Sequence, residues 1–231
     1  MTIAENVNKI HKEIAETAQQ CGRTPDGITL LGVTKTIETE RIKQLLNAGV
    51  TTLGENRVQE FLPKYEALSI LPNPPEWHFI GHLQKNKVKY IIDKVTLIHS
   101  VDSIGLAQEI NKQAKKIGIV MNILVEVNIA EEFSKFGIAP QQILKFVNHL
   151  KDLHNVQLKG LMCVPPFVEN AQENRLNFRK MRNLQVDIQG KSLYSTELDI
   201  LSMGMSGDYL VAIEEGATIV RLGTALFGDR V

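Results

Sequence analysis

The chain has 231 residues, of which 43% are hydrophobic and 23% charged, the balance of a globular protein with room for one large domain. Its 26 basic and 26 acidic side chains cancel, so the positive field that nucleic-acid binding requires is missing. The sequence holds neither an apolar signal region nor a run of about 18 apolar residues, so we expect a cytoplasmic protein that does not enter membranes.

Apolar residues at every third or fourth position predict a helix from Ile3 to Cys21, ended by Gly22. Beyond it, short apolar runs alternate with helical patterns. In the first half we expect strands at 28–33, 50–53, 77–80 and 97–101, and helices at 38–48, at 57–68 and, short and basic, up to about 92. Pro63 is expected to kink the helix over 57–68.

The second half repeats this plan. We expect strands at 121–129, 158–164, 199–203 and 217–222, and helices at 102–116, 140–153, 169–189 and 209–215. Short strands without a polar face, each followed by a helix, are typical of parallel sheets covered on both sides. Eight such units predict a single α/β domain over 1–231, a closed (β/α)8 TIM-type barrel with an extra N-terminal helix. An open doubly wound sheet is the alternative.

Active sites of such barrels lie at the C-terminal ends of the strands, so the residues after each strand are the candidates. Lys35 directly follows the first strand. Burial of its stem would favour the neutral amine that Schiff-base chemistry needs. Alternatively, Lys35 extends from the strand end into solvent.

The loops after the last two strands are rich in glycine and hydroxyl groups. The seventh strand leads into Ser202-Met203-Gly204-Met205-Ser206-Gly207-Asp208, and the eighth into Gly223-Thr224. Small residues let backbone N–H groups approach a phosphate, and these two loops often bind phosphate in TIM barrels. Arg221 lies on the eighth strand and could pair with phosphate, hold a planar group, or be neutralised by Glu55 or Glu126.

The remaining candidates lie outside these two loops. Asn56, His82 and Cys163 follow other strands, and we expect Cys163 to be a core residue, with a redox role left open. Cys21 and Cys163 show neither a disulfide framework nor metal-ligand spacing, so no metal site is predicted. The basic run Lys85, Lys87 and Lys89 is interpreted as a solvated helix end.

Three longer motifs carry a family resemblance. They are the segments GENRVQE over 54–60, WHFIGHLQKNK over 77–87 and LSMGMSGD over 201–208. Together with Lys35 and the Arg221-x-Gly223 pattern, they resemble the pyridoxal 5′-phosphate (PLP) homeostasis protein family, which is related to the alanine racemase N-terminal barrel. The resemblance covers residues 31–228, nearly the whole chain.

The resemblance implies a PLP-binding site. PLP would form a Schiff base with Lys35, its phosphate would bind Ser206, Gly223 and Thr224, and Arg221 would face the pyridine nitrogen. The site would also include the neighbouring residues Asn56, His82, Ser202 and Met203. One departure is that Thr36-Ile37-Glu38 stands where relatives commonly have a proline, which affects only the start of the next helix.

A racemase needs acid–base groups on both faces of the substrate carbon. In the alanine racemases a tyrosine from an additional β domain supplies one of them, and we expect no such domain here. Tyr65, Tyr90, Tyr194 and Tyr209 are expected in helices or loops. We therefore expect a monomeric protein of intracellular PLP homeostasis and amino-acid/keto-acid balance, with little or no turnover. PLP-dependent apo-enzymes or regulatory proteins are its candidate partners, and a PLP-dependent amino-acid racemase or a cofactor-free aldolase using Lys35 are the alternatives.

Overall fold

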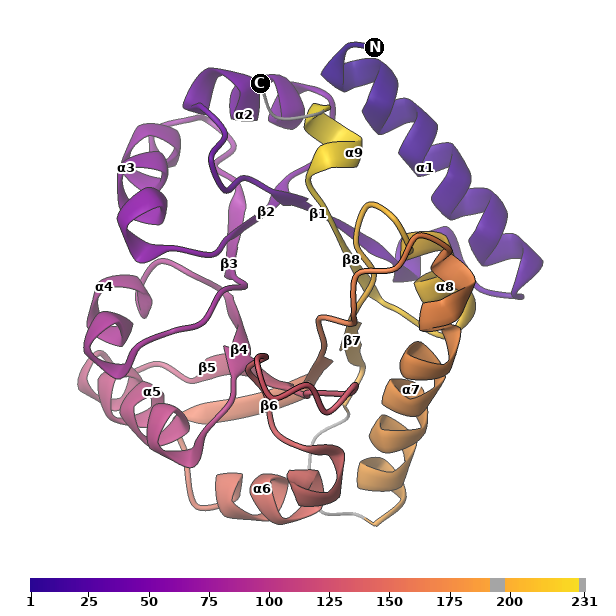
Figure 1. Ribbon diagram of the computed structural model, residues 1–231. Coiled ribbons are helices and arrows are strands. Elements are labelled where there is room, and N and C mark those ends of the chain that lie inside the picture. The colour runs from indigo at the N-terminus through magenta and orange to yellow at the C-terminus, as the bar shows by residue number, and fades with distance from the viewer. Residues whose placement is uncertain (192–197, 229–231) are drawn as a thin grey trace.

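The computed structural model describes residues 1–191 and 198–228, whose parallel strands close into a barrel in chain order, with β1 paired to both β2 and β8. The strands are β1 (Thr29–Val33), β2 (Thr52–Glu55), β3 (Glu76–Phe79), β4 (Leu97–Val101), β5 (Met121–Glu126), β6 (Val156–Met162), β7 (Ile200–Ser202) and β8 (Ile219–Leu222). Figure 1 shows this barrel down its axis, with the helices around it. The predicted (β/α)8 barrel is confirmed, and the open sheet is excluded because β1 and β8 pair.

The helices follow the strands as the sequence predicts. They are α1 (Ile3–Gln20), α2 (Thr39–Asn47), α3 (Val58–Ser69), α4 (Val88–Ile91), α5 (Ile104–Lys116), α6 (Ile143–Leu150), α7 (Arg175–Gly190), α8 (Tyr209–Glu214) and α9 (Thr224–Phe227). Short 3-10 turns add η1 (Pro25–Gly27), η2 (Lys85–Lys87), η3 (Pro140–Gln142) and η4 (Ala171–Asn174). Within the described part of the chain, none of these helices is both long and apolar enough to cross a membrane.

The predicted extra helix, α1, lies outside the barrel. Thr2 and Glu5 form a capping box at its start, which satisfies two backbone N–H groups of its first turn. The apolar stripe that includes Val7, Ile10 and Ile14 is buried. This face packs against α2, α8 and α9, so α1 joins the first and last helices of the barrel (Figure 1).

The barrel has an apolar interior distinct from the layer between strands and helices. Inward-facing residues of five strands form this separate cluster: Leu31, Val33, Leu97, Leu124, Met162 and Ile219. Gly54 makes room for it, because a Cβ there would lie 2.5 Å from the Leu31 side chain. Polar inward-facing residues lie next to this apolar layer and form the candidate site.

Several strand boundaries differ from the prediction. The strand β6 covers 156–162 where 158–164 was expected, β8 begins at 219 and not at 217, and two further differences have a visible cause. The strand predicted at 50–53 is β2 at 52–55, because the Val50 N–H bonds the Leu45 carbonyl and so still belongs to the end of α2. The strand predicted at 121–129 ends at Glu126. The Val127 N–H still bonds the Met162 carbonyl of β6, but the Asn128 N–H turns to the Ile138 carbonyl, so the backbone leaves the barrel ladder at Asn128.

Candidate functional site

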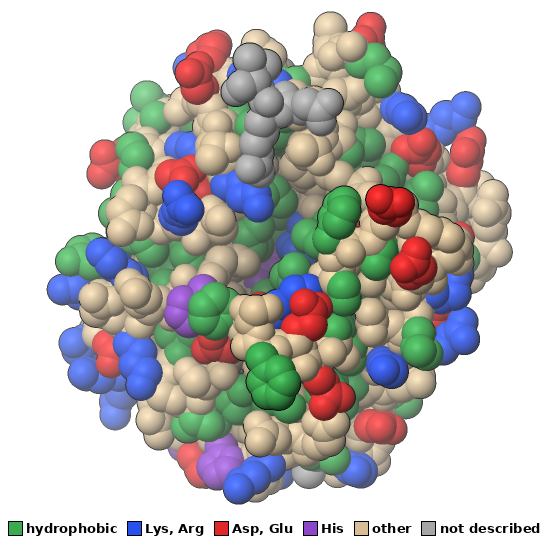
Figure 2. Space-filling view, in the orientation of Figure 1, with side chains coloured by type: hydrophobic (Ala, Val, Ile, Leu, Met, Phe, Trp, Pro, Cys, Tyr) green, Lys and Arg blue, Asp and Glu red, His purple; other side chains and the backbone are tan. Residues whose placement is uncertain are grey.

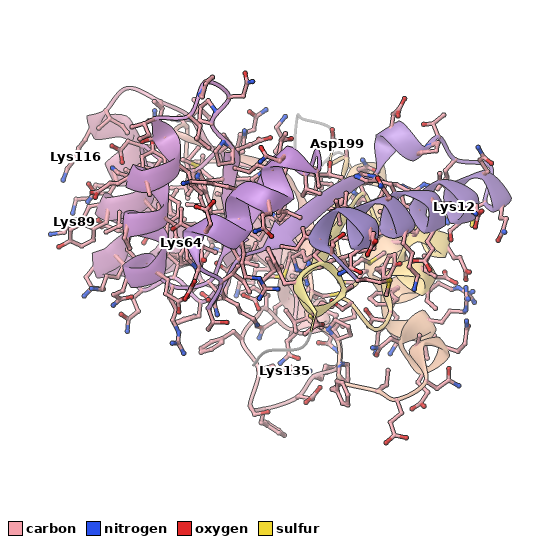
Figure 3. All side chains as sticks on the ribbon, turned by 90° about the horizontal axis from the view of Figure 1, so that it is seen from above. Lys12, Lys64, Lys89, Lys116, Lys135 and Asp199 are labelled. Atoms are coloured by element: carbon pink, nitrogen blue, oxygen red, sulfur yellow. The ribbon has the colours of Figure 1, made fainter. Side chains whose placement is uncertain are left out.

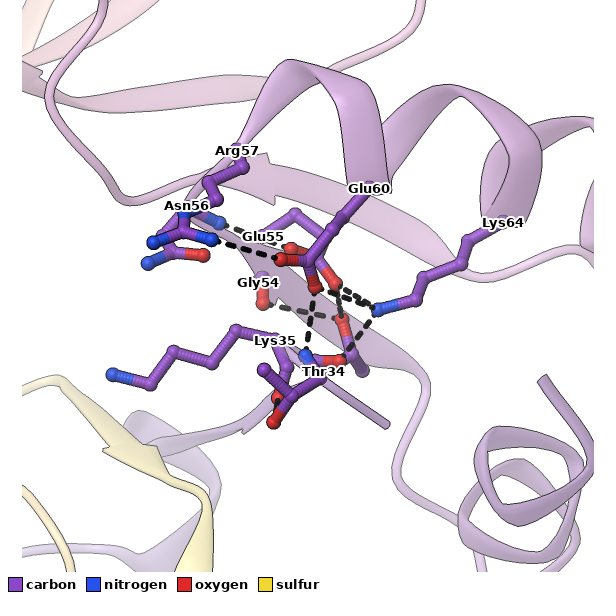
Figure 4. A network of polar contacts seen from close by, with 9 residues as sticks. Thr34, Lys35, Gly54, Glu55, Asn56, Arg57, Glu60 and Lys64 are labelled. Atoms are coloured by element: carbon purple, nitrogen blue, oxygen red, sulfur yellow. Dashed lines mark hydrogen bonds and ion pairs between the residues drawn. The ribbon is translucent and has the colours of Figure 1, made fainter. Parts of the chain in front are cut away.

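The backbone on both sides of Lys35 is held by α3. Lys64 Nζ donates to the Thr34 carbonyl at 2.7 Å, and the Thr36 N–H donates to Glu60 Oε2 at 2.7 Å. Figure 4 shows these contacts on one side of the chain and the Lys35 side chain extending to the other. The peptide groups around Lys35 are thus fixed while its half-buried side chain is directed away from the network.

This anchor depends on a buried ion pair. Lys64 Nζ lies 2.6 Å from Oε1 of Glu55, a completely buried carboxylate that also accepts a bond from the Thr34 hydroxyl at 2.8 Å. Glu55 was one of two carboxylates that the sequence allowed as a partner of Arg221. The structure excludes this alternative for Glu55, because it is the last residue of β2 and pairs with Lys64 of α3.

Thr36 itself has an unusual backbone conformation. Its φ of 63° lies in the left-handed region, which few residues other than glycine adopt. The bond to Glu60 holds the Thr36 N–H in this turn, and the Thr36 N–H is in turn the first cause of a lowered pKa for Glu60. After the turn, α2 begins at Thr39, one residue from the predicted start.

Arg221 points into the barrel and is 5% exposed. Its Nη1 donates to Ser202 Oγ at 2.7 Å, and its Nη2 donates to the Cys163 carbonyl at 2.8 Å. Burial lowers the pKa of the guanidinium, while Glu126 is among the groups that oppose this effect. Arg221 stays charged because an arginine side chain does not deprotonate in proteins.

The loops after β7 and β8 meet at Ser206. Its hydroxyl oxygen accepts bonds from the N–H groups of Gly223 at 3.3 Å and Ala225 at 3.2 Å. Ser206 and Thr224 also line a surface groove of about 750 Å³ that continues along α1. Ala225 was not among the residues predicted from the sequence, because its contribution is a backbone N–H, which no side-chain pattern reveals.

Asp208 holds the loop after β7 in shape. Its Oδ1 accepts the Met205 N–H at 2.7 Å, and its Oδ2 accepts a bond from the Asn174 side chain at 2.9 Å. Gly204 allows the close turn, since it has φ of 92° and a Cβ there would lie 2.6 Å from Ala212. Met203, a predicted site residue, is completely buried in the hydrophobic core around the strands, so a ligand would meet its backbone and not its side chain.

Asn56 and His82 line a second cavity of about 340 Å³ together with Arg57, Gly81 and Lys87. Lys35 and Arg221 are not among its lining residues. The His82 ring stacks on Phe136, with centroids 3.9 Å apart, and its Nδ1 lies 3.1 Å from Asp102 Oδ2. The buried Oδ1 of Asn56 has no hydrogen-bond partner, so this second cavity offers an acceptor to a ligand.

Glu126 ends β5 and is mostly buried at 8% exposure. Burial first, and the charge of Asp102 second, raise its pKa to about 7, while Arg221 opposes them. A carboxyl group that changes charge near neutral pH is a candidate acid or base. From the sequence, Glu126 was expected only as a possible counter-ion of Arg221.

The remaining groups that the sequence offers for chemistry are its tyrosines and cysteines. Tyr65, Tyr90 and Tyr209 are on the outer helices α3, α4 and α8, as expected, and Tyr194 lies outside the described residues. Burial raises the pKa of the Cys163 thiol to about 12, whereas Cys21 is exposed. Across residues 1–191 and 198–228, no cluster of three His, Cys, Asp or Glu side chains is arranged to hold a metal ion.

The face that carries the C-terminal strand ends is hollowed over the centre of the barrel (Figure 2). Lys135, on the loop between β5 and α6, projects from the same face at the lower edge of Figure 3. Three of the predicted site elements follow or belong to neighbouring strands of the closed barrel: Lys35 follows β1, the Ser206 loop follows β7, and Arg221 lies on β8.

Comparison with known proteins gives consistent results. Residues 6–231 match the family described as alanine racemase, N-terminal domain. The chain is 47% identical over 230 residues to the pyridoxal phosphate homeostasis protein of Aquifex aeolicus, covering 100% of this chain and 99% of the relative. It is 35% identical to the protein of that name from Escherichia coli, covering 99% of this chain and 97% of the relative.

Solved structures agree. PipY of Synechococcus elongatus, solved with PLP bound, superposes with a TM-score of 0.81 at 34% identity, covering 93% of this chain and 100% of PipY. An alanine racemase of Clostridium difficile, with a TM-score of 0.73 and 16% identity, covers 98% of this chain but 57% of that one, and shares the fold alone. By full-length identity, matching family and shared fold, the chain belongs to the pyridoxal phosphate homeostasis protein family, within the alanine racemase N-terminal-domain group.

Proposed function

We propose that this protein binds PLP as a Schiff base on Lys35 and acts in intracellular PLP homeostasis and amino-acid/keto-acid balance, with little or no catalytic turnover. The observation that carries the proposal is the strand order. Lys35, Arg221 and the Ser206 loop belong to or directly follow β1, β8 and β7, which are neighbours in the closed barrel. The relatives' name and the PLP bound to PipY support the choice of ligand.

The donors present fit the phosphate of PLP. Gly223 and Ala225 direct two backbone N–H groups at one point, where Ser206 adds a hydroxyl. Such a convergence of N–H groups suits an anion, and a phosphate there would replace Ser206 as their acceptor. Thr224, exposed between the two N–H groups, adds a second hydroxyl.

The remaining polar groups fit the ring and the aldehyde. Arg221 would face the pyridine nitrogen, where its permanent positive charge disfavours protonation of that nitrogen and weakens the ring as an electron sink. Lys35 would bond the aldehyde carbon with loss of water. Asn56 and His82 would contact the ligand from the β2 and β3 side. Such a site holds the cofactor better than it drives carbanion chemistry.

Glu126 favours one second candidate, a PLP-dependent amino-acid racemase. With its pKa raised to about 7, this carboxyl could exchange a proton near neutral pH, which the outer tyrosines are not placed to do. A panel of amino acids separates the two functions: sustained racemisation at ~1 s⁻¹ or faster would reject the homeostasis proposal. Slower or undetectable turnover supports it.

Lys35→Ala tests the covalent site. We expect the purified wild-type protein with PLP to absorb as a Schiff base and the variant to lose this band while keeping its circular dichroism. Lys112→Ala, at an exposed lysine of α5, is the control and should keep the band. Borohydride reduction and peptide mapping should place the pyridoxyl group on Lys35. A band that survives in Lys35→Ala would reject the proposal, and wild type without a PLP band would favour the aldolase alternative.

Within the same proposal the protein acts in the cytoplasm as a monomer, and PLP-dependent apo-enzymes or regulatory proteins receive or sense its PLP. Mixing the PLP-loaded protein with an apo-enzyme and following that enzyme's recovery of activity measures the transfer. Recovery no faster than with an equal concentration of free PLP would argue against delivery.

A further inference from the structure

Two histidines lie inside the barrel, next to the apolar cluster of its interior. His78 of β3 is 5% exposed and His99 of β4 is completely buried, and the centroids of their rings are 5.0 Å apart. His99 Nε2 lies 3.0 Å from His78 Nδ1. Buried polar groups in an apolar core are costly unless each finds a partner, so the outer nitrogens of this pair need one too.

Both outer nitrogens have partners, and these extend the pair into a chain across the barrel. His99 Nδ1 lies 2.9 Å from Ser202 Oγ, the atom that accepts the bond from Arg221. At the other end, His78 Nε2 lies 3.4 Å from Glu76 Oε1, on a half-exposed side chain at the start of β3. The chain therefore runs from Arg221 at the C-terminal strand ends to solvent at the opposite end of the barrel.

When both rings are neutral, the two ends favour the same direction for every bond between them. Arg221 can only donate, so Ser202 accepts from it and keeps its own hydrogen available for His99 Nδ1. An ionised carboxylate can only accept, so His78 Nε2 donates to Glu76 and leaves His78 Nδ1 as an acceptor. His99 Nε2–H then donates to His78 Nδ1, and every link has one donor and one acceptor.

We infer that Ser202, His99, His78 and Glu76 form a one-directional hydrogen-bond relay that positions the Arg221 guanidinium, with both histidines neutral and protonated on Nε2. What the relay would mean for a bound PLP, whose ring nitrogen Arg221 would face, rests on the proposed function. The relay gives His78, inside the motif over 77–87, a role that the predicted PLP contacts do not include. Ser202 thereby acts as a positioning residue for Arg221.

The charges along the relay agree with this direction. Burial is the largest cause that keeps the pKa of His99 well below its ordinary value, and the charge of Arg221 acts in the same direction, so no second cation forms beside the guanidinium. Bonds from His78 and Thr96 lower the pKa of Glu76 to about 2, so it remains an acceptor at neutral pH. A fully satisfied buried network of this kind holds its members rigidly.

The first test needs no ligand. Long-range ¹H–¹⁵N correlation of the ligand-free protein reports which ring nitrogen of each histidine carries hydrogen, with His78→Gln and His99→Gln used for assignment. We expect both rings as neutral Nε2–H tautomers. If His78 is doubly protonated at pH 7, or if either ring carries hydrogen only on Nδ1, the direction is reversed and the inference is wrong.

The second test breaks the relay and then repairs it. His99→Leu removes both ring nitrogens, whereas the amide of His99→Gln can still accept from Ser202 and donate to His78. We expect His99→Leu to weaken PLP binding about tenfold and to change the pH dependence of the bound PLP absorbance, and His99→Gln to stay within about threefold of wild type. Equal binding and equal pH profiles in the two variants would overturn the inference.

A third variant covers the case in which His99→Leu does not fold. Glu76→Ala removes the half-exposed terminal acceptor at the start of β3, the opposite end of the barrel from the proposed PLP site, and Glu66→Ala removes an exposed carboxylate of α3 as its control. We expect the PLP pH profile to shift in Glu76→Ala alone. No shift would contradict the relay. If wild type binds no PLP at all, the proposed function fails, and the tautomer measurement still decides whether the relay exists.

Discussion

The phosphate donors of the proposed site converge on one side chain. Ser206 bridges Gly223 and Ala225, so its removal takes one hydroxyl from the ligand and loosens the two loops. We expect Ser206→Ala to weaken PLP retention about tenfold, as for loss of a hydrogen bond to a charged group. Dialysis followed by absorbance measures the retained PLP.

Cys163→Ala is the matched control for this change. Arg221 bonds the Cys163 carbonyl and not its thiol, so the substitution preserves that contact. We expect its PLP retention to stay near wild type. Equal losses in the two variants would remove the support for a phosphate site at Ser206.

The two cysteines should differ in reactivity. Cys163 is completely buried and burial raises its pKa to about 12, so the reactive thiolate is absent at neutral pH, whereas Cys21 is exposed. We expect a thiol reagent to modify Cys21 in the native protein and Cys163 only after denaturation. Rapid modification of Cys163 in Cys21→Ser would reopen a redox role for it.

At the scale of residues, the sequence best predicts the side chains that come directly after a strand. Lys35, Ser206 and Arg221 could be placed at the barrel mouth because apolar runs reveal where strands end. Lys64 and Glu60 lie in a helical pattern and His99 lies within a strand, and nothing in either pattern shows which backbone or ring they contact. Those contacts depend on strand register and helix packing, which a single sequence does not determine.

At the scale of elements, α3 is the support of the lysine loop. Its Lys64 pairs with the buried Glu55 of β2 and bonds the Thr34 carbonyl just after β1. We expect Lys64→Met to lower the free energy of unfolding by about 3–5 kcal/mol, because Glu55 is left buried without its cation. Urea unfolding of the ligand-free protein measures this.

A double variant separates the ion pair from the packing of α3. Glu55→Gln combined with Lys64→Met removes both charges, so much of the lost stability should return. If the double variant is as unstable as the sum of the two single variants, the pair is not the reason for the loss.

The element boundaries show where local sequence stops being informative. The prediction located α1 and α2 to within about a residue, because a periodic apolar stripe and a glycine identify a helix and its end. It placed β2 two residues early, because Val50 is as apolar as a strand residue but completes the turn after Gly49. Apolar character is shared by strands and by buried helix ends, so it does not separate them.

At the scale of the whole molecule, Glu126 should couple stability to pH. Its pKa rises from 4.5 to about 7 in the folded protein, so the folded state binds more protons than the unfolded state between these values. The stability that protonated Glu126 contributes to the folded protein is therefore complete below pH 4.5 and is lost as pH rises through 7. The total change in the free energy of unfolding is roughly 3 kcal/mol.

Glu126→Gln removes this titration. We expect the free energy of unfolding of wild type, measured in urea without ligand, to fall relative to the variant as pH rises from 4.5 to 8. A difference that stays constant over this range would show that Glu126 does not titrate there.

The pairing of β1 with β8, together with the packing of α1 on α8 and α9, has a consequence for biosynthesis. Lys35 leaves the ribosome well before Arg221 and the Gly223 turn. A nascent chain consequently carries an unsealed sheet and an uncovered first helix until β8 and the helices beside it have been made. Ligand capture at the proposed site therefore requires β8, and a ribosome stalled before residue 219 should display no ligand-binding competence.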